Sequence, residues 1–154
     1  MSAKAFDIVI SGASFAGLAL ARSLRLALGK DLTIALVDRA AGPPSGDDTR
    51  AFAIWAGARN VLNAIGVWRA LESAAQPMTT IEITDSALED GLRSALLTYD
   101  ATTADGAVAG YIVPSYDLHR ALFATLDGDA NVTWIAPAEA EGLAADTAGI
   151  TTTL

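Results

Sequence analysis

Two glycines, Gly12 and Gly17, frame a short loop whose backbone could hold a phosphate group. Residues 12–17 read Gly-Ala-Ser-Phe-Ala-Gly, which differs at one place, Ser14, from the pattern G-x-G-x-x-G. In that pattern the first glycine allows a tight turn, the second lets the backbone approach a pyrophosphate, and the third lets a helix pack closely on a strand. The N-terminus of the following helix stabilises the negative charge. The loop therefore predicts a dinucleotide or flavin site, with these candidate contacts: Gly12, Ala13, Ser14, Phe15, Ala16 and Gly17.

An acidic residue stands where such a site would need one. Asp38 follows Gly17 by about 20 residues. At this spacing in dinucleotide-binding sequences, a carboxylate accepts hydrogen bonds from the ribose hydroxyls. An arginine at this place would instead accommodate a 2′-phosphate, so Asp38 argues against NADP at this loop. The neighbouring Arg39 is a further candidate contact. The alternative is a strand-to-helix turn that needs small residues, with Asp38 capping the next loop.

A strand, a helix and a second strand must position these residues. Residues 5–11 and 32–38 are short apolar runs, which suit buried parallel strands. Residues 15–28 between them are rich in alanine and leucine, and Gly29 follows as a C-terminal cap. This order predicts one βαβ unit with a right-handed crossover.

The rest of the chain alternates shorter elements. Residues 39–49 are rich in Gly, Pro, Ser and Asp, which predicts a loop. Ser115 is expected to be the N-cap of a helix. The other expectations are helices over 51–65, 67–74 and 115–126, strands over 78–85, 93–99, 107–113 and 131–135, and an antiparallel pair formed by 141–143 and 150–154.

The predicted fold class is α/β. We expect a Rossmann-like FAD/NAD(P)-binding fold with a parallel central sheet and an antiparallel strand insertion. Because the chain ends inside a predicted strand, we expect a truncated fold. Residues 1–154 would then be the N-terminal part of an FAD-binding domain, without the later flavin motifs and the substrate domain.

Composition excludes several other classes of protein. The 154 residues are 52% hydrophobic with a mean hydropathy of +0.37, which fits one domain with a sizeable core. A formal charge of -8 with scattered basic residues argues against a nucleic-acid partner. The absence of cysteine and the single histidine argue against a metal site. No signal peptide or membrane-spanning run is recognisable, so a cytoplasmic protein is expected.

The segment after the loop carries a family resemblance. Residues 48–54 read Asp-Thr-Arg-Ala-Phe-Ala-Ile, and residues 62–68 end in Gly-Val-Trp. This D-x-R-A-x-A-(I/L) pattern leading into L-G-(L/V)-W resembles the FAD-dependent aromatic hydroxylases, a family of flavoprotein monooxygenases. It is most similar to the branch that hydroxylates polyprenyl-phenol precursors in ubiquinone biosynthesis. Residues 110–113 and 131–133 agree, so the resemblance covers the whole chain but only the first part of a family member.

The resemblance implies FAD bound through the glycine loop and Asp38, with Arg50 contacting the cofactor. It also implies NAD(P)H as reductant, a C4a-hydroperoxide on the flavin that transfers one oxygen to an electron-rich ring, and a small-molecule aromatic substrate. It identifies no catalytic residue. It leaves room for contact of the whole protein with a membrane surface, and exposed strand edges invite association between copies. Considered alone, Arg50 fits an anion-facing role, and the alternative is a surface ion pair with Asp47 or Asp48.

The sequence also contains a single histidine and leaves two rival functions open. His119, the only histidine, is expected to lie far from the glycine loop in a solvated or packing role. The rival functions are another FAD or NAD oxidoreductase built on the same βαβ unit and a nucleotide-binding module without turnover.

Overall fold

A computed structural model describes residues 4–29, 31–42, 48–85, 87, 89 and 91–154. Its first sheet is parallel, with three strands in the order β1-β2-β8. Ile10 pairs with Leu36, and Leu36 pairs in turn with Trp134. All four residues of the central strand β2 are buried. The elements of this unit are β1 (Ile8–Ser11), α1 (Phe15–Leu28), β2 (Ile34–Val37) and β8 (Val132–Ile135).

The predicted βαβ unit is therefore present. Helix α1 has the predicted bounds, and Gly29 follows it with a φ of 96° that suits a glycine cap. The two strands are shorter than the apolar runs that predicted them, because only the last four residues of the first run and the central four of the second enter the sheet. Residues 43–47 of the predicted loop lie outside the described residues.

A second sheet, antiparallel, has the strand order β3-β7-β4. Here the helix predicted over residues 51–65 is wrong in its first part, because residues 51–55 form a strand and the helix begins at Ala56. Phe52 pairs with Val113 and Ile54 with Tyr111, so strand pairing overrides the local helical preference. The second predicted helix, over residues 67–74, is reduced to a single 3-10 turn. The elements are β3 (Ala51–Trp55), α2 (Ala56–Ala64), η1 (Trp68–Ala70), β4 (Gln76–Pro77) and β7 (Gly110–Pro114).

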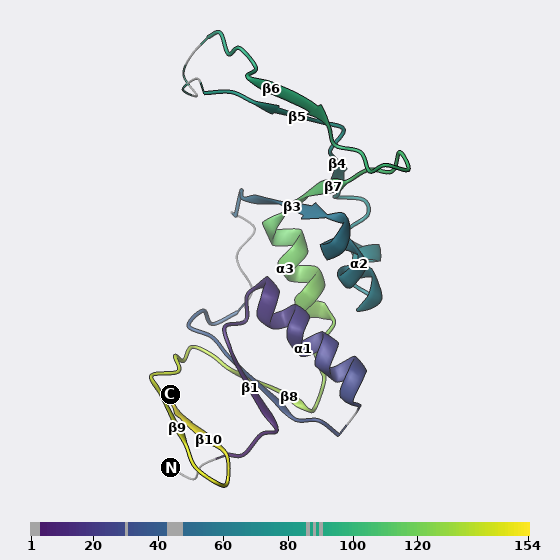
Figure 1. Ribbon diagram of the computed structural model, residues 1–154. Helices are drawn as coiled ribbons and strands as arrows, with labels where there is room; N and C mark the ends of the chain where they lie inside the picture. The colour runs from purple at the N-terminus through teal and green to yellow at the C-terminus, as the bar shows by residue number, and fades with distance from the viewer. Residues whose placement is uncertain (1–3, 30, 43–47, 86, 88, 90) are drawn as a thin grey trace.

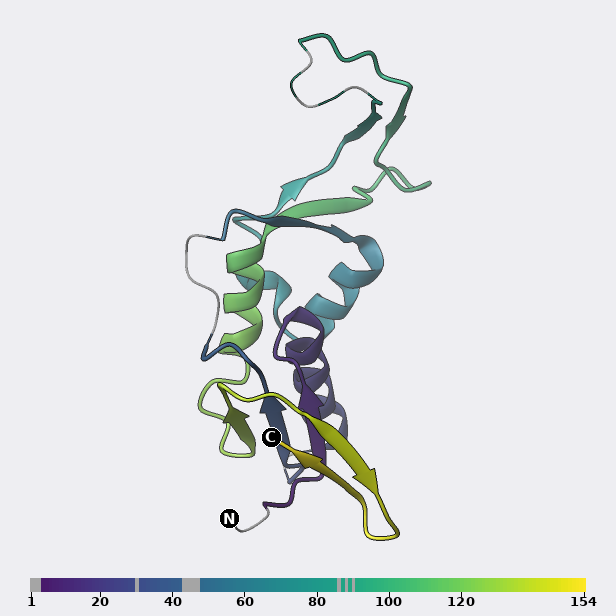
Figure 2. The same cartoon turned by 90° about the vertical axis from the view of Figure 1, so that its left-hand side faces the viewer.

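Helix α3 (Ser115–Ala124) packs beside α1, and both helices lie between the two sheets (Figures 1 and 2). Leu18 of α1 and Leu122 of α3 are fully buried in the core between them. The expectation that Ser115 is the N-cap is wrong, because Pro114 occupies that position. Ser115 is instead buried at the first position of the helix, where its hydroxyl makes a contact described below.

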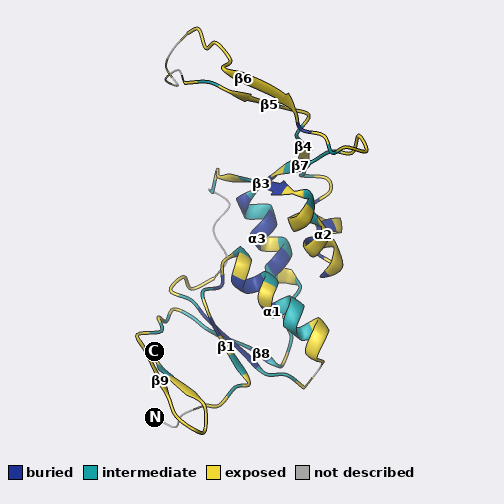
Figure 3. Cartoon of the chain, viewed as in Figure 1, coloured by how far each residue is buried: buried dark blue, intermediate teal, exposed yellow. Residues whose placement is uncertain are grey.

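Two hairpins extend from this body. Strands β5 (Thr80–Ile83) and β6 (Leu97–Asp100) form an antiparallel arm with mostly exposed residues, at the top of Figure 3. Strands β9 (Gly142–Ala145) and β10 (Ile150–Thr153) form the antiparallel pair that was predicted near the C-terminus. The described residues thus form a mixed α/β fold with one parallel sheet and three antiparallel ones.

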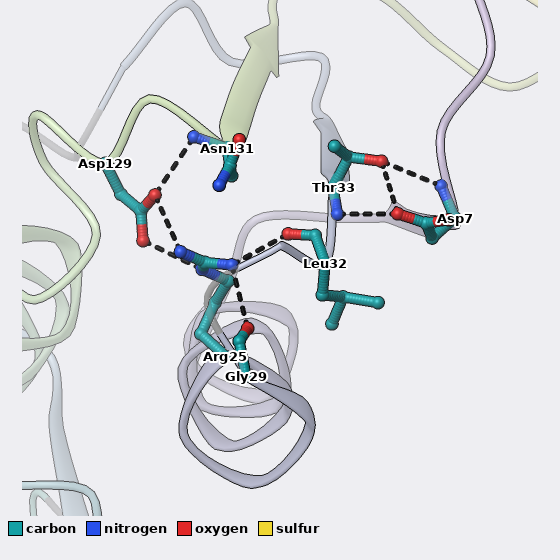
Figure 4. Close-up of polar contacts among 7 residues, drawn as sticks. All are labelled: Asp7, Arg25, Gly29, Leu32, Thr33, Asp129 and Asn131. Carbon is teal, nitrogen blue, oxygen red and sulfur yellow. Dashed lines mark hydrogen bonds and ion pairs between the residues drawn. The ribbon is translucent and has the colours of Figure 1, made fainter.

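A partly buried ion pair fixes the C-terminal end of α1 (Figure 4). The guanidinium of Arg25 is 9% exposed and donates to both carboxylate oxygens of Asp129, at 2.8 and 3.1 Å. It also donates to the carbonyl oxygen of Leu32, at 2.8 Å. Burial opposes ionisation of Asp129, but the Asn131 backbone N–H and Arg25 outweigh it, so the pKa of Asp129 is lowered. The helix is thereby tied to the entrances of both β2 and β8.

Candidate functional site

The glycine loop has the geometry that its sequence predicts. Gly12 has a φ of 102°, which favours glycine, and its N–H donates to the Val37 carbonyl oxygen at 2.7 Å. A Cβ on Gly17 would lie 1.8 Å from the Gly12 carbonyl oxygen, so only a glycine fits there. The two glycines are thus required for different reasons, one for its backbone angle and the other for close packing.

Three backbone N–H groups at the start of α1 are left without partners. These are the amides of Ser14, Phe15 and Ala16, for which no acceptor occurs among the described residues. The first N–H groups of a helix have no partner within the helix, and the helix dipole favours negative charge beside them. Ser14 is the N-cap in an extended conformation, and its hydroxyl makes no capping bond. The loop therefore offers several donors to one anion.

Asp38 links the end of β2 to the loop. Its Oδ2 accepts a 2.6 Å hydrogen bond from the Ala13 N–H, and its Oδ1 accepts one of 2.7 Å from the Ala40 N–H. Asp38 therefore caps the loop that follows β2, as the alternative interpretation predicted. It also lies against the glycine loop. A carboxylate has about four acceptor sites, so Asp38 retains capacity for hydroxyl donors.

Arg50 belongs to a second polar cluster. Its Nε and Nη2 donate to the two carboxylate oxygens of Asp48, at 2.8 and 2.9 Å. The hydrogen bonds from Arg50 and then from Ser115 hold the pKa of Asp48 well below its usual range. The Arg50 side chain is 71% exposed. Arg50 is thus paired with Asp48, as the alternative interpretation proposed, while the other suggested partner, Asp47, lies outside the described residues.

Two cavities meet the glycine loop. The larger one, of about 500 Å³, is lined by residues of the loop together with Arg50 and His119. The second, of about 380 Å³, is lined in part by Arg39, whose guanidinium lies 3.7 Å from the Glu139 carboxylate. Both cavities share Ser14 and Asp38 as lining residues. These volumes are those of small-molecule sites.

His119 is the residue that the sequence misplaced. It is not far from the glycine loop, because its Nε2 lies 3.0 Å from the Ala13 carbonyl oxygen. His119 is 8% exposed, and its ring meets the Phe15 ring edge-on, with centroids 5.9 Å apart. Its Nδ1 is buried and has no hydrogen-bond partner among the described residues. The contact spans 106 residues of sequence, and no local pattern marks it.

The described residues contain neither a metal-ligand cluster nor a membrane-spanning helix. No group of three or more His, Cys, Asp or Glu in the described part of the chain could hold a metal ion. Among the same residues, no helix combines the length and apolarity needed to cross a bilayer.

Comparison with known proteins places this fold. No family model matches the sequence, and no curated protein is similar to it at the level of sequence. Solved structures are similar. The flavin-dependent monooxygenase PieE, solved with FAD and substrate, matches over 96% of this chain with a TM-score of 0.72 and 18% identity. An oxygenase of 2-methyl-3-hydroxypyridine-5-carboxylic acid matches over 97% with a TM-score of 0.65 and 16% identity.

A third similar structure is that of a protein named for a different reaction. The Diels-Alderase PyrE3 of pyrroindomycin biosynthesis matches over 95% of this chain, with a TM-score of 0.67 and 18% identity. The chain spans only 26%, 38% and 28% of the lengths of these three proteins, in the order given. We conclude that this chain has the fold of the corresponding part of flavin-dependent monooxygenases.

Proposed function

We propose that this chain supplies the adenosine-diphosphate-binding part of an FAD-dependent monooxygenase. The observation that carries the proposal is the set of three unpartnered N–H groups at Ser14, Phe15 and Ala16, next to a carboxylate, Asp38, at the rim of two cavities. The likeness of the fold to flavin-dependent monooxygenases supports the same cofactor.

The residues present fit such a cofactor. The free amides and the positive end of the α1 dipole would hold the pyrophosphate. Asp38 would accept the ribose hydroxyls with its remaining acceptor sites. Arg39 and Arg50 would face the anionic parts, Arg39 from the second cavity and Arg50 from the larger one. The missing Cβ at Gly17 lets α1 approach the loop closely enough to aim its N-terminus at the anion.

Within the whole protein, bound FAD reduced by NAD(P)H would activate O2 for transfer of one oxygen atom to an electron-rich aromatic ring. The described residues contribute binding, orientation and walls. Phe15 and Phe52 meet edge-on with centroids 4.8 Å apart, and this apolar pair helps to exclude water beside the loop. None of the described residues is assigned a proton-transfer role.

The substrate is proposed on narrower grounds. The family resemblance of positions 48–54 implies a polyprenyl-phenol, and the similar pyridine oxygenase takes an aromatic ring as substrate. The similar Diels-Alderase supports a second candidate function, in which the same nucleotide-binding unit serves a reaction without oxygen transfer. Product analysis with 18O2 and a polyprenyl-phenol separates the two, because only the monooxygenase incorporates the label.

The binding proposal is tested by titrating the 15N-labelled chain with ADP and FAD. We expect saturable shifts of the Ser14, Phe15 and Ala16 amide signals, and weaker binding of adenosine 2′,5′-bisphosphate because its 2′-phosphate would face Asp38. Replacement of Asp38 by alanine should weaken binding by about 1–3 kcal/mol, the scale of a hydrogen bond to a charged group. Asp31→Ala, beyond the opposite end of β2, is the matched control and should bind normally. Absence of saturable binding in the wild-type chain would refute the proposal.

A further inference from the structure

We propose that His119 is a positioning residue for the pyrophosphate-binding loop. By donating a hydrogen bond from Nε2 to the Ala13 carbonyl oxygen, it orients the Ser14 N–H for an anion. The inference rests on the proposed function, because the anion in question is the pyrophosphate of the nucleotide.

His119 contacts the peptide between Ala13 and Ser14. A carbonyl oxygen only accepts hydrogen bonds, so at a separation of 3.0 Å the Nε2 of His119 must carry the proton. In a planar trans peptide the C=O of one residue and the N–H of the next point in opposite directions. With the Ala13 oxygen held against α3, the Ser14 N–H therefore faces away from His119. No other donor to this oxygen occurs among the described residues.

The peptide on the other side of Ala13 is held as well. Its N–H is bonded to Asp38 Oδ2 at 2.6 Å, so this donor is already occupied. The two peptide planes that flank Ala13 are thus anchored from two different elements, the end of β2 and the second turn of α3. This double anchor fixes which amide of the loop is occupied and which is free. The Ser14 N–H is the first free donor in the loop.

The ring is suited to this task rather than to packing alone. His119 is 8% exposed and meets the Phe15 ring, and the buried residues nearest to it along its own helix are Leu118 and Leu122. A leucine there would fill the space without the cost of a buried acceptor, the Nδ1 atom, that has no partner in the described part of the chain. Because His119 is largely buried, its hydrogen bond to Ala13 is stronger than a surface one.

The test compares three variants by NMR and ADP titration. His119→Leu removes the donor, and we expect the dissociation constant for ADP to rise about tenfold or more, the effect of one misdirected donor to a charged group. His119→Gln places an N–H near the position of Nε2 and should bring the dissociation constant back to within about threefold of wild type. His119→Asn is too short to reach the Ala13 oxygen and should behave like His119→Leu.

Further readouts separate positioning from general stability. In the free protein, the Ser14 amide signal should move in His119→Leu and return in His119→Gln, and 15N spectra of the ring should show the proton on Nε2. The matched control is Leu122→Ala on the same helix, which should lower the melting temperature but leave ADP binding within about twofold, because Leu122 lines neither of the two cavities beside the loop. If His119→Leu does not fold, the comparison of His119→Gln with His119→Asn decides the matter.

The outcomes distinguish this inference from the proposed function. Unchanged ADP binding and an unmoved Ser14 signal in His119→Leu or His119→Asn, beside a wild type that binds, would overturn the role of His119 and leave the nucleotide site standing. A wild-type chain that binds neither ADP nor FAD would overturn both.

Discussion

The hydroxyl of Ser115 donates a 2.6 Å hydrogen bond to Oδ2 of Asp48, and so joins the start of α3 to a segment 67 residues earlier in the chain. The Ser115 N–H also donates to the Arg50 carbonyl oxygen, at 2.8 Å. Asp48 in turn holds the Arg50 guanidinium through both of its oxygens. One buried serine thus sets the position of the cation at the edge of the larger cavity.

Ser115→Ala should loosen this cluster. Loss of one hydrogen bond in a domain of this size should lower the melting temperature by about 2–4 °C. We also expect weaker FAD binding, because Arg50 and Asp48 would no longer be held to α3. Calorimetry and FAD titration measure the two effects. The control is Ser23→Ala, whose hydroxyl donates to the Ala19 carbonyl oxygen in its own helix, at 2.7 Å. Equal effects of the two substitutions would contradict this role for Ser115.

The carboxylates with lowered pKa values predict loss of stability in acid. The pKa of Asp129 is lowered although burial opposes this, because the Asn131 N–H and Arg25 stabilise the charged form. Hydrogen bonds from Arg50 likewise lower the pKa of Asp48. Since the unfolded-state pKa is about 3.9, the stabilisation is complete above it and is lost as pH falls through the lower folded-state values.

Asp129→Asn isolates one part of this effect. It should reduce the free energy of unfolding at pH 7 by about 1–3 kcal/mol, less than for a fully buried pair because Asp129 is 24% exposed. It should also flatten the fall in stability between about pH 4 and pH 2. Urea titrations across this range measure both quantities, with Asp31→Asn as an exposed control. A variant with the wild-type pH profile would show that the Arg25 ion pair does not contribute.

Two glycine-to-alanine substitutions should change the stability of the protein in opposite directions. Gly17→Ala places a Cβ 1.8 Å from a backbone oxygen that cannot easily move, so we expect a destabilisation of about 2–4 kcal/mol and loss of nucleotide binding. Gly57→Ala in helix α2 meets nothing within 4 Å and should stabilise the protein by about 0.5 kcal/mol. Thermal unfolding of the pair compares them directly. A mild Gly17→Ala variant would mean that the loop is not packed against α1 as described.

Ser14→Gly restores the usual glycine of the loop pattern. Because it removes a Cβ from the approach of the phosphate, we expect cofactor binding to be kept or improved. The cost to α1 should be only a few tenths of a kcal/mol, since glycine is an acceptable N-cap and the serine hydroxyl makes no capping bond. Titration with ADP and FAD measures the change. A large loss of affinity would show instead that the Ser14 hydroxyl is itself a phosphate ligand.

The first βαβ unit could be predicted from sequence because its signals are local. An apolar run, a glycine loop, an alanine- and leucine-rich segment and Gly29 each specify their own conformation, and the structure places α1 at the predicted bounds. Strand β3 could not be predicted in this way. Its residues, Ala51–Trp55, are compatible with a helix, and only pairing with β7, far away in sequence, makes them a strand.

The residues of the candidate site show the same difference between local and long-range signals. Asp38 could be predicted as a candidate because of its fixed spacing from the glycine loop, and the structure places it against the Ala13 N–H. His119 and Ser115 were misjudged because their partners, Ala13 and Asp48, are 106 and 67 residues away. Contacts between residues so far apart in sequence depend on how α3 packs between the two sheets. Neither the periodicity nor the composition of the sequence predicts that packing.

The exposed arm formed by β5 and β6 means that the molecule does not open as one cooperative unit. A two-stranded hairpin without a packed face is marginally stable in water, so Thr80–Ile83 should exchange their amide hydrogens through local opening. The buried residues of β2, Ile34–Val37, should exchange only when the core itself unfolds. Trp68, which is buried in that core, would then report global unfolding by fluorescence while circular dichroism also registers the arm. The two probes should therefore give transitions that do not coincide.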